Sequence, residues 1–332
     1  MLIINHSQVR ELLPIRDCME VVGEALSCLA RGEGVQPLRS GFLLPDRRGV
    51  LAWMPGSLAA GQPFGIKVLS VVDNPGELGV DSHQGGVMIF DPTNGAPLAL
   101  CEAGAITAVR TAAVSALATD RLARPDAATV AILGSGTQAR SHIEAMLEIR
   151  PISRFRVWSR DPEKVRIFAE EQAARHGVVV ETAADVASAV DDFDIVCTTT
   201  SAREPVLSAE MLEPGMHINA VGASIPSWRE IDPGVLPLVS LFTDRRESLA
   251  NEAGEYIKGL EEGFVETGLV VPEIGEVLND DHPGRTSDSE ITLFRSLGLA
   301  VEDIAAAQLV YERALELGVG TEVDLSGSAS NR

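Results

Sequence analysis

The segment ATVAILGSGTQA, Ala128–Ala139, decides the fold. It begins as an uninterrupted apolar run, which is typical of a central strand in a parallel sheet. Gly134-Ser135-Gly136-Thr137-Gln138-Ala139 then follows the pattern G-x-G-x-x-G/A at the start of a helical stretch. Gly134 permits the tight turn, and Gly136 lets the backbone approach a pyrophosphate that faces the N–H groups of the helix. The segment therefore predicts a dinucleotide site of the Rossmann type.

Strands and helices are expected to alternate beyond this segment. Asp161-Pro162 predicts the start of a helix that His176-Gly177 ends. The stretch 291–315 is expected to be helical, apart from a break at Gly298. Five further strands are expected, at 155–160, 178–183, 193–200, 216–224 and 238–244. Alternating strands and helices indicate an α/β fold with a doubly wound parallel sheet.

The region before this sheet is expected to form a second α/β layer. Strands are expected at 64–72, 85–91 and 96–102, with Asn94-Gly95 as the hairpin turn. The Ala-rich stretch from Glu102 to Ala123 has no internal proline and predicts one long helix.

Composition narrows the function. A chain of 332 residues favours two domains, and its net charge of −21 argues against nucleic acid as a partner. No apolar stretch is long enough to span a membrane, and the start of the chain lacks the pattern of a signal peptide. The four cysteines have no spacing typical of metal sites, so we expect no metal, reduced thiols and a cytoplasmic protein.

The end of the second predicted strand bears on the choice of cofactor. An acidic residue there would hold the ribose of NAD, but the chain has Ser159-Arg160, with Lys164 one helical turn further on. Because Arg160 can grip a 2′-phosphate through paired N–H groups, we expect NADP(H) to be preferred. NAD(H) stays open, with Asp161 on the ribose and Arg160 in solvent.

Ligands of such sheets bind at the carboxyl ends of the strands. Thr198, Thr199 and Thr200 end one predicted strand, and Val221 and Gly222 end the next. We expect Thr199, Thr200, Val221 and Gly222 to touch the cofactor, although the β-propensity of threonine explains its presence equally well.

Three cations stand in apolar surroundings. Arg110 lies on the apolar stripe of the long helix, and Lys67 interrupts the strand FGIKVLSVV. An unpaired charge is costly there, so Arg110 needs a protein carboxylate or a ligand carboxylate as its partner. Lys67 either points its ammonium into a cleft, where burial would lower its pKa and let it exchange a proton near neutral pH, or reaches solvent from an edge strand. Arg39 in QPLRSG is a weaker candidate for the same role, and His83 beside Gly85-Gly86 is a candidate for substrate contact or an ordinary loop histidine. Three cations near a nicotinamide favour a small keto, amino or imino acid as substrate.

The segments SHQGGVMIFDPTNG, ILGSGTQARSH, INAVGASIPSWREID and SEITLFRSLGLAVED, with the helix that carries Arg110, resemble the ornithine cyclodeaminase/mu-crystallin family. The resemblance covers nearly the whole chain. It implies a homodimer, and a Rossmann domain (121–299) inserted into a substrate-binding and dimerisation domain (1–120 plus 300–325). It also implies that Arg39, Lys67 and Arg110 anchor a substrate carboxylate. The small polar residues of the tail (326–332) predict disorder.

One position divides the family. True ornithine cyclodeaminases have a catalytic aspartate where this chain has Ser224, and the run GASIPSWRE is closer to the mu-crystallin ketimine reductases, which use NADPH. The resemblance therefore implies an imine reductase that converts Δ1-pyrroline-2-carboxylate or Δ1-piperideine-2-carboxylate to proline or pipecolate, with Lys67, Arg110 and Ser224 at the reacting centre. A cyclodeaminase, an enzyme like alanine dehydrogenase and a non-catalytic NADPH-dependent binder remain alternatives.

Overall fold

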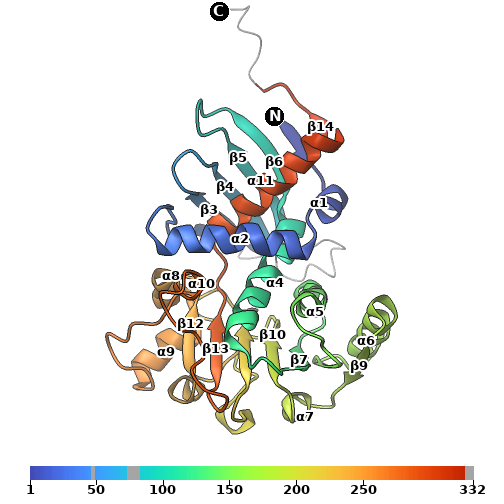
Figure 1. Cartoon of the computed structure of the whole chain (residues 1–332), viewed down its shortest axis with the longest axis vertical. Helices are drawn as coiled ribbons and strands as arrows, with labels where there is room; N and C mark the ends of the chain where they lie inside the picture. The colour runs from blue at the N-terminus through green and yellow to red at the C-terminus, as the bar shows by residue number, and fades with distance from the viewer. Residues whose placement is uncertain (46–48, 73–82, 326–332) are drawn as a thin grey trace, which may run out of the picture. The chain divides into compact units, whose positions relative to one another are not determined.

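The computed structural model describes residues 1–45, 49–72 and 83–325, with the side chain of His83 left out. The chain divides into two compact units (Figure 1). The first comprises Met1–Arg110 and Leu299–Arg332, and the second comprises Thr111–Gly298. The division falls inside helix α4 (Ala103–Leu122), whereas the sequence analysis placed it at the end of that helix. The tail at 326–332 lies outside the described residues.

The second unit is built on a parallel sheet. Its seven strands run in the order β12-β13-β11-β10-β7-β8-β9, and every neighbouring pair is parallel. From β7 the chain runs outward through β8 and β9, then returns to β10 on the other side of β7, which is the doubly wound arrangement. The expected fold class is confirmed. The strands are β7 (Thr129–Leu133), β8 (Arg154–Trp158), β9 (Val179–Thr182), β10 (Ile195–Thr198), β11 (His217–Ala220), β12 (Ser240–Thr243) and β13 (Thr292–Arg295).

Strand β13 corrects the sequence analysis, which expected a helix there. Its four residues are all buried between β11 and β12. A short apolar run that is buried on both faces has no period of its own, so it cannot be told from a piece of buried helix by pattern. Only the part after Gly298 is helical, as α11 (Ala300–Leu317).

Helices cover both faces of this sheet. Ala131 and Leu133 of β7 pack in one apolar cluster with residues of α7 (Val186–Val190). On the other face, Asn219 of β11 donates a hydrogen bond to Thr119 in the second half of α4. The remaining helices of the unit are α5 (Thr137–Ile149), α6 (Pro162–His176), α8 (Arg246–Glu252), α9 (Gly254–Glu262), α10 (Ile274–Leu278) and the short 3-10 turns η1 (Ala209–Met211) and η2 (Pro233–Leu238).

Helix α6 begins and ends as predicted. Asp161 caps its first turn, Pro162 follows as the first helical residue, and Gly177 ends it with a left-handed φ of 67°. This cap fixes the orientation of the Asp161 side chain, which matters for the cofactor below.

The first unit is built on a mixed sheet in the order β14-β1-β6-β5-β4-β3-β2. Only β1 and β6 are parallel to each other. The hairpin at Asn94-Gly95 joins β5 to β6 as expected, with Gly95 at a φ of 73°. The strands are β1 (Leu2–Ile4), β2 (Ser40–Leu43), β3 (Gly49–Ser57), β4 (Phe64–Val72), β5 (His83–Phe90), β6 (Pro97–Glu102) and β14 (Thr321–Glu322).

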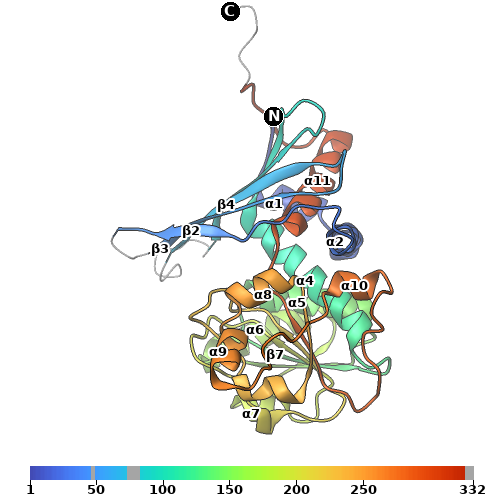
Figure 2. The same ribbon diagram turned by 90° about the vertical axis from the view of Figure 1, so that its left-hand side faces the viewer.

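One face of this sheet carries helix α11 (Figure 2). Gly56 and Gly65 lie under it, and a Cβ at either position would come within 3.3 Å of Ile304. Helices α2 (Ile15–Ala30) and α1 (His6–Leu12) both pack on α11. Strand β4 is therefore buried on one side only, and not on both as its apolar sequence suggests. None of the described helices is long and apolar enough to cross a membrane.

Candidate active site

The carboxyl ends of the strands in the second unit form one row. The residues in register along it are Trp158, Leu133, Thr198, Ala220, Arg295 and Thr243. The candidate cofactor residues directly follow members of this row. The sheet therefore gathers at one edge groups that are up to about 90 positions apart in the chain.

Gly134 is held against the neighbouring strand end. Its φ is 124°, and a Cβ here would lie 2.7 Å from both the carbonyl oxygen and Oγ1 of Thr199. The Thr199 N–H donates to the carbonyl of Leu133 at 2.8 Å, which fixes this close approach. Only glycine fits here, both because of its backbone conformation and because of the space.

Gly136 serves a different purpose. A Cβ at this position would meet no atom within 4 Å, so the backbone beside it is open. Gly136 is the N-cap of α5, and no side chain caps this helix. The first N–H groups of α5 can therefore bind an anion. Ser135, Thr137 and Gln138 flank this opening, with Thr137 exposed and the other two half-buried.

The end of β8 presents Ser159 and Arg160. Arg160 is exposed, and no hydrogen bond or ion pair engages it within the part of the chain that the structure describes. Asp161 instead accepts the backbone N–H groups of Glu163 and Lys164, both at 3.1 Å. The Lys164 ammonium lies 3.7 Å from the same carboxylate. The acid next to Arg160 is thus occupied as a helix cap.

A residue that the sequence analysis missed connects the next two strand ends. Glu230 is buried, and its carboxylate accepts hydrogen bonds from Thr198, Thr200 and the N–H of Gly222. The hydroxyls of Thr198 and Thr200 are therefore engaged with a protein carboxylate, whereas that of Thr199 donates to the carbonyl of Leu133 at 3.1 Å. Val221, between these partners, is buried.

The loop after β11 contains Ser224, which is half-buried. Arg295 is buried at the end of β13, forms an ion pair with Glu255 and donates to the carbonyl of Ala220 at 2.9 Å. It also donates to the carbonyl of Ala223, the residue before Ser224. The loop that carries Ser224 is thus tied to the sheet through a buried guanidinium.

In the first unit, Lys67 lies on the buried face of β4. Its side chain is 2% exposed, and its ammonium donates to Thr107 at 2.6 Å and to Asp303 at 3.0 Å. Burial lowers the pKa of Lys67 to about 8, with the attraction of Asp303 opposing this shift. A lysine with this pKa can exchange a proton near neutral pH.

Arg110 joins the same cluster from α4. Its Nε donates to Asp303 and its Nη1 donates to Glu302, both at 2.9 Å. Burial favours the neutral form of Asp303, but Arg110 and Lys67 outweigh it and hold the pKa of Asp303 below its usual value. The partner that Arg110 required is therefore a pair of protein carboxylates at the first turn of α11.

Arg39 is half-buried directly before β2, and its charge contributes to lowering the pKa of Lys67. The structure therefore brings the three predicted cations into one electrostatic neighbourhood. His83 begins β5 opposite Val71, and its side chain lies outside the described part of the chain.

The sequence analysis did not select Glu302, Asp303 or Glu230, and these residues differ in whether a local pattern could have revealed them. Glu302 and Asp303 interrupt an apolar helix, LAVEDIAAA, so the criterion that selected Arg110 would have selected them. Glu230 stands in a loop between Arg229 and Ile231, and no local pattern marks it. Its role depends on the arrangement of two strand ends.

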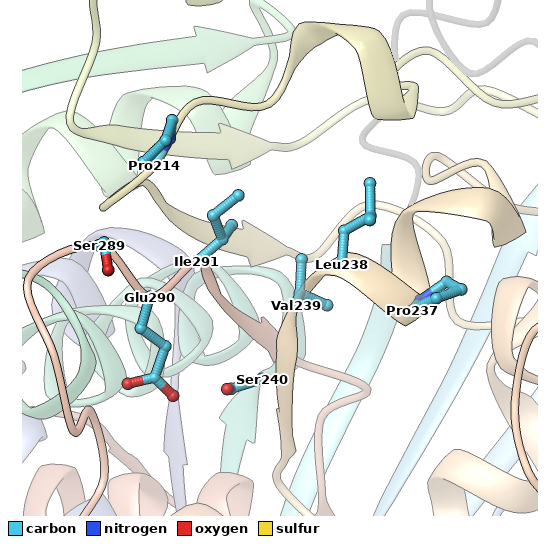
Figure 3. A pocket seen from close by; sticks show the side chains of 8 residues that line it. All are labelled: Pro214, Pro237, Leu238, Val239, Ser240, Ser289, Glu290 and Ile291. Carbon is cyan, nitrogen blue, oxygen red and sulfur yellow. The ribbon is translucent and has the colours of Figure 1, made fainter.

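A shallow hollow of about 350 Å³ lies elsewhere on the second unit (Figure 3). Its lining residues precede β11, β12 and β13, among them Pro214, Val239 and Ile291. This is the amino edge of the sheet, opposite to the row of carboxyl ends, so the hollow is no candidate for the cofactor. No group of three potential metal ligands occurs among the described residues.

The fold and these sites define an α/β protein whose second unit is of the Rossmann type and whose first unit contains a buried cluster of charges. The chain belongs to the ornithine cyclodeaminase/mu-crystallin family, whose model matches residues 1–318.

Relatives in this family are similar over most of the chain. A Delta(1)-pyrroline-2-carboxylate reductase of Bacillus cereus is 33% identical, over 98% of this chain and 100% of its own. The ketimine reductase mu-crystallin of Mus musculus is 38% identical, over 85% of this chain and 86% of its own.

Two solved structures are also similar. The Delta(1)-pyrroline-2-carboxylate reductase of Thermococcus litoralis, in complex with NADH and L-proline, has a TM-score of 0.94 at 36% identity, covering 97% of this chain and 100% of its own. An archaeal alanine dehydrogenase dimer with bound NAD has a TM-score of 0.91 at 29% identity, covering 98% and 99%.

Proposed function

We propose that this protein is an NAD(P)H-dependent imine reductase that acts on a small cyclic 2-imino acid. The substrates proposed are Δ1-pyrroline-2-carboxylate and Δ1-piperideine-2-carboxylate, and the products are proline and pipecolate. The observation that carries the proposal is the Lys67–Arg110–Asp303 cluster in a chain that also has an open glycine loop. The named activities of the reductase relatives support it.

The buried cluster suits a substrate carboxylate. Lys67 and Arg110 are held by Asp303 and Glu302, and Arg39 is close enough for its charge to lower the pKa of Lys67. These cations would attract a substrate carboxylate, and burial would strengthen the attraction. The internal carboxylates meanwhile hold both cations in place before substrate binds.

Lys67 is also suited to donate the proton that imine reduction requires. A C=N bond accepts hydride readily only when its nitrogen is protonated, and the lowered pKa of Lys67 makes the ammonium a better acid than a solvent-exposed lysine. In this proposal Lys67 holds the substrate carboxylate or donates the proton to the imine nitrogen, and Arg110 orients the substrate through its carboxylate. Ser224 can form a hydrogen bond through its hydroxyl but does not act as a base. A bound reduced nicotinamide supplies the hydride.

The residues of the second unit fit such a cofactor. Gly134, Ser135, Gly136, Thr137 and Gln138 would hold the pyrophosphate, because the space beside Gly136 is open and α5 has no capping side chain. Thr199, Thr200, Val221 and Gly222 would line the nicotinamide half.

We propose NADP(H) as the preferred form of the cofactor. Asp161 is engaged as the cap of α6, which leaves Arg160, with Ser159 and Lys164 beside it, to contact the 2′ position. A 2′-phosphate satisfies an arginine there better than a hydroxyl does.

We also propose a homodimer that forms through the first unit. The face of its sheet that lacks α11 is apolar, and Phe42, Phe64 and Val68 on it are 51%, 38% and 39% exposed. The strand registers place further apolar residues of this face beside them, namely Leu51, Trp53, Ile66, Met88, Phe90 and Leu100. A continuous apolar face of this kind marks an interface, and a second copy is the occupant we propose, in line with the alanine dehydrogenase dimer.

The dimer is tested by Val68→Lys, with Val179→Lys as the matched control on the other unit, where Val179 is 55% exposed. Light scattering should show a monomer for the first variant and the wild-type mass for the second. A wild-type monomer, or a dimer that tolerates Val68→Lys, would contradict the proposed interface.

The activity is tested with the purified protein and preformed cyclic imines, by following NADPH absorbance and identifying proline or pipecolate. We expect oxidation of NADPH in proportion to product. If neither NADPH nor NADH is oxidised with either imine between pH 5 and 8, the proposed reaction is wrong.

The similarity to an alanine dehydrogenase favours one second candidate, the reductive amination of an acyclic keto acid. Pyruvate with ammonia or methylamine in the same assay distinguishes the two. A higher kcat/KM for the acyclic imine would replace the cyclic substrate in the proposal.

A further inference from the structure

The second unit contains a buried carboxyl group at the ends of β10 and β11. Glu230 is 2% exposed, and its Oε1 accepts the N–H and the hydroxyl of Thr200 at 2.6 and 2.7 Å. Its Oε2 accepts the hydroxyl of Thr198 at 2.8 Å and the N–H of Gly222 at 2.5 Å. Four donors therefore converge on one carboxylate, and none of them carries a charge.

This donor set matches the ionised form of the carboxyl group. Each oxygen faces one backbone N–H, which can only donate, and each also faces a hydroxyl that can rotate to donate. Burial raises the pKa of Glu230, while the hydrogen bonds from Thr200 and Thr198 and the charge of Arg295 oppose that shift. Arg295 is itself engaged with Glu255 and with backbone carbonyls, so it forms no ion pair with Glu230.

The position of this charge relative to a bound dinucleotide follows from the order of the strands. The pyrophosphate belongs at Gly134–Thr137, after β7, and Arg160 lies on the β8 side of that loop. A dinucleotide with its adenosine half at β8 extends its nicotinamide half to the other side, where β10 and β11 end. Gly222 lies so close that a Cβ would be 2.7 Å from Oε1 of Glu230.

We propose that the buried charge of Glu230 favours the oxidised, cationic nicotinamide ring over the reduced, neutral ring. In a low-dielectric site a fixed carboxylate attracts a cationic ring over several ångströms, while the neutral ring gains little. Because the ring becomes positive as hydride leaves with its electron pair, the same charge also eases that departure. Glu230 thereby has two roles: it positions Thr200 and Gly222 beside the nicotinamide ring, and its negative charge acts on the ring through space. This inference rests on the proposed function only in that a nicotinamide dinucleotide binds at this edge.

The test compares the affinities of the two cofactor forms, without substrate, by titration calorimetry. Glu230→Gln removes the charge and keeps the shape. We expect the ratio Kd(NADP+)/Kd(NADPH) to rise about fivefold to tenfold, as for one charge at moderate distance and intermediate dielectric. Thr198→Val is the matched control, because it removes one hydrogen bond and keeps the charge, and its ratio should stay at the wild-type value.

A second pair of variants covers the case in which Glu230→Gln does not fold. Glu230→Asp and Glu230→Asn have the same size and differ only in charge, so the ratio should be higher for the asparagine variant. Equal weakening of both forms in the neutral variants, or no change, overturns the inference and leaves Glu230 a structural residue. If wild-type protein binds neither cofactor form, the proposed function itself fails.

Discussion

The two units prepare for anions in opposite ways. The first places Lys67 and Arg110 in the interior and must supply Glu302 and Asp303 to balance them, because buried charges without partners are unstable. The second places open backbone N–H groups at Gly136 and the start of α5, and needs no counter-charge. A chain with a net charge of −21 can thus hold two anions by local means.

This difference predicts different consequences of mutation. Side chains in the first unit carry both stability and chemistry, since removing one charge leaves another uncompensated. In the second unit, the backbone of the glycine loop would bind the dinucleotide. The charge of Arg160 would affect only the choice between NADP(H) and NAD(H).

The largest effect is expected for Lys67→Met. It removes the proposed proton donor, so kcat with a cyclic imine should fall by about 10²–10⁴-fold, while the Kd for NADPH stays unchanged. Lys258→Met is the control, because Lys258 is on the surface of α9 and pairs only with Glu261 and Glu262 among the described residues. Turnover within a factor of two of wild type in Lys67→Met would refute the role of this lysine, whereas a pure binder would show no turnover even in the wild-type protein.

The next largest effects are expected for two substitutions in the glycine loop. They separate the need for glycine's backbone conformation at Gly134 from the need for open space beside Gly136, where the cofactor would approach. Gly134→Ala forces a Cβ against Thr199 at a φ of 124°, and should cost about 1–3 kcal/mol of folding free energy as well as cofactor affinity. Gly136→Ala meets no protein atom, so its stability should change by less than about 1 kcal/mol.

Both variants should bind NADPH at least about tenfold more weakly, since a loss of only ~1.4 kcal/mol is enough for that. Denaturant unfolding and cofactor titration measure the two quantities separately. If Gly136→Ala bound NADPH as well as wild type does, the pyrophosphate would not lie where we propose.

The same contrast explains what could be read from the sequence. The glycine loop, the cap at Asp161 and the left-handed end at Gly177 are local, so short motifs predict them correctly. Lys67 and Arg110 also stand out locally, as charges in apolar segments. Glu230 does not, because its four donors come from two strand ends and its function exists only once the sheet has formed.

Strand β13 was mistaken for helix for a related reason. Thr292–Arg295 is buried on both faces, and such a run has no alternation to reveal the strand. The uncovered face of the first sheet was equally hidden, since β4 has apolar residues on both of its faces and the register with β3 and β5 is needed to show which residues α11 covers.

A smaller effect is expected at the cofactor's 2′ position. Arg160→Ser should raise the Kd for NADPH about tenfold and leave the Kd for NADH unchanged, as expected for the loss of a charge-assisted hydrogen bond pair. Asp161→Ala is the informative companion. It removes the cap of α6 and should cost about 1 kcal/mol of stability without raising the Kd for NADH. Weaker NADH binding in Asp161→Ala would instead assign the ribose to Asp161 and make NAD(H) the natural cofactor.

The smallest effect concerns pH and tests whether the first unit works through the charge of Lys67. The proposed role requires the ammonium form, which is present below the pKa of about 8 and is lost as the pH rises through it. The value of kcat/KM should therefore decline about tenfold per pH unit above that point. Lys67→Arg separates this from titration of the imine itself, because arginine stays protonated. Any residual activity of that variant should decline only where the substrate loses its proton. Identical profiles for wild type and Lys67→Arg would mean that the buried lysine does not set the pH dependence, and that the cluster holds the substrate without exchanging a proton.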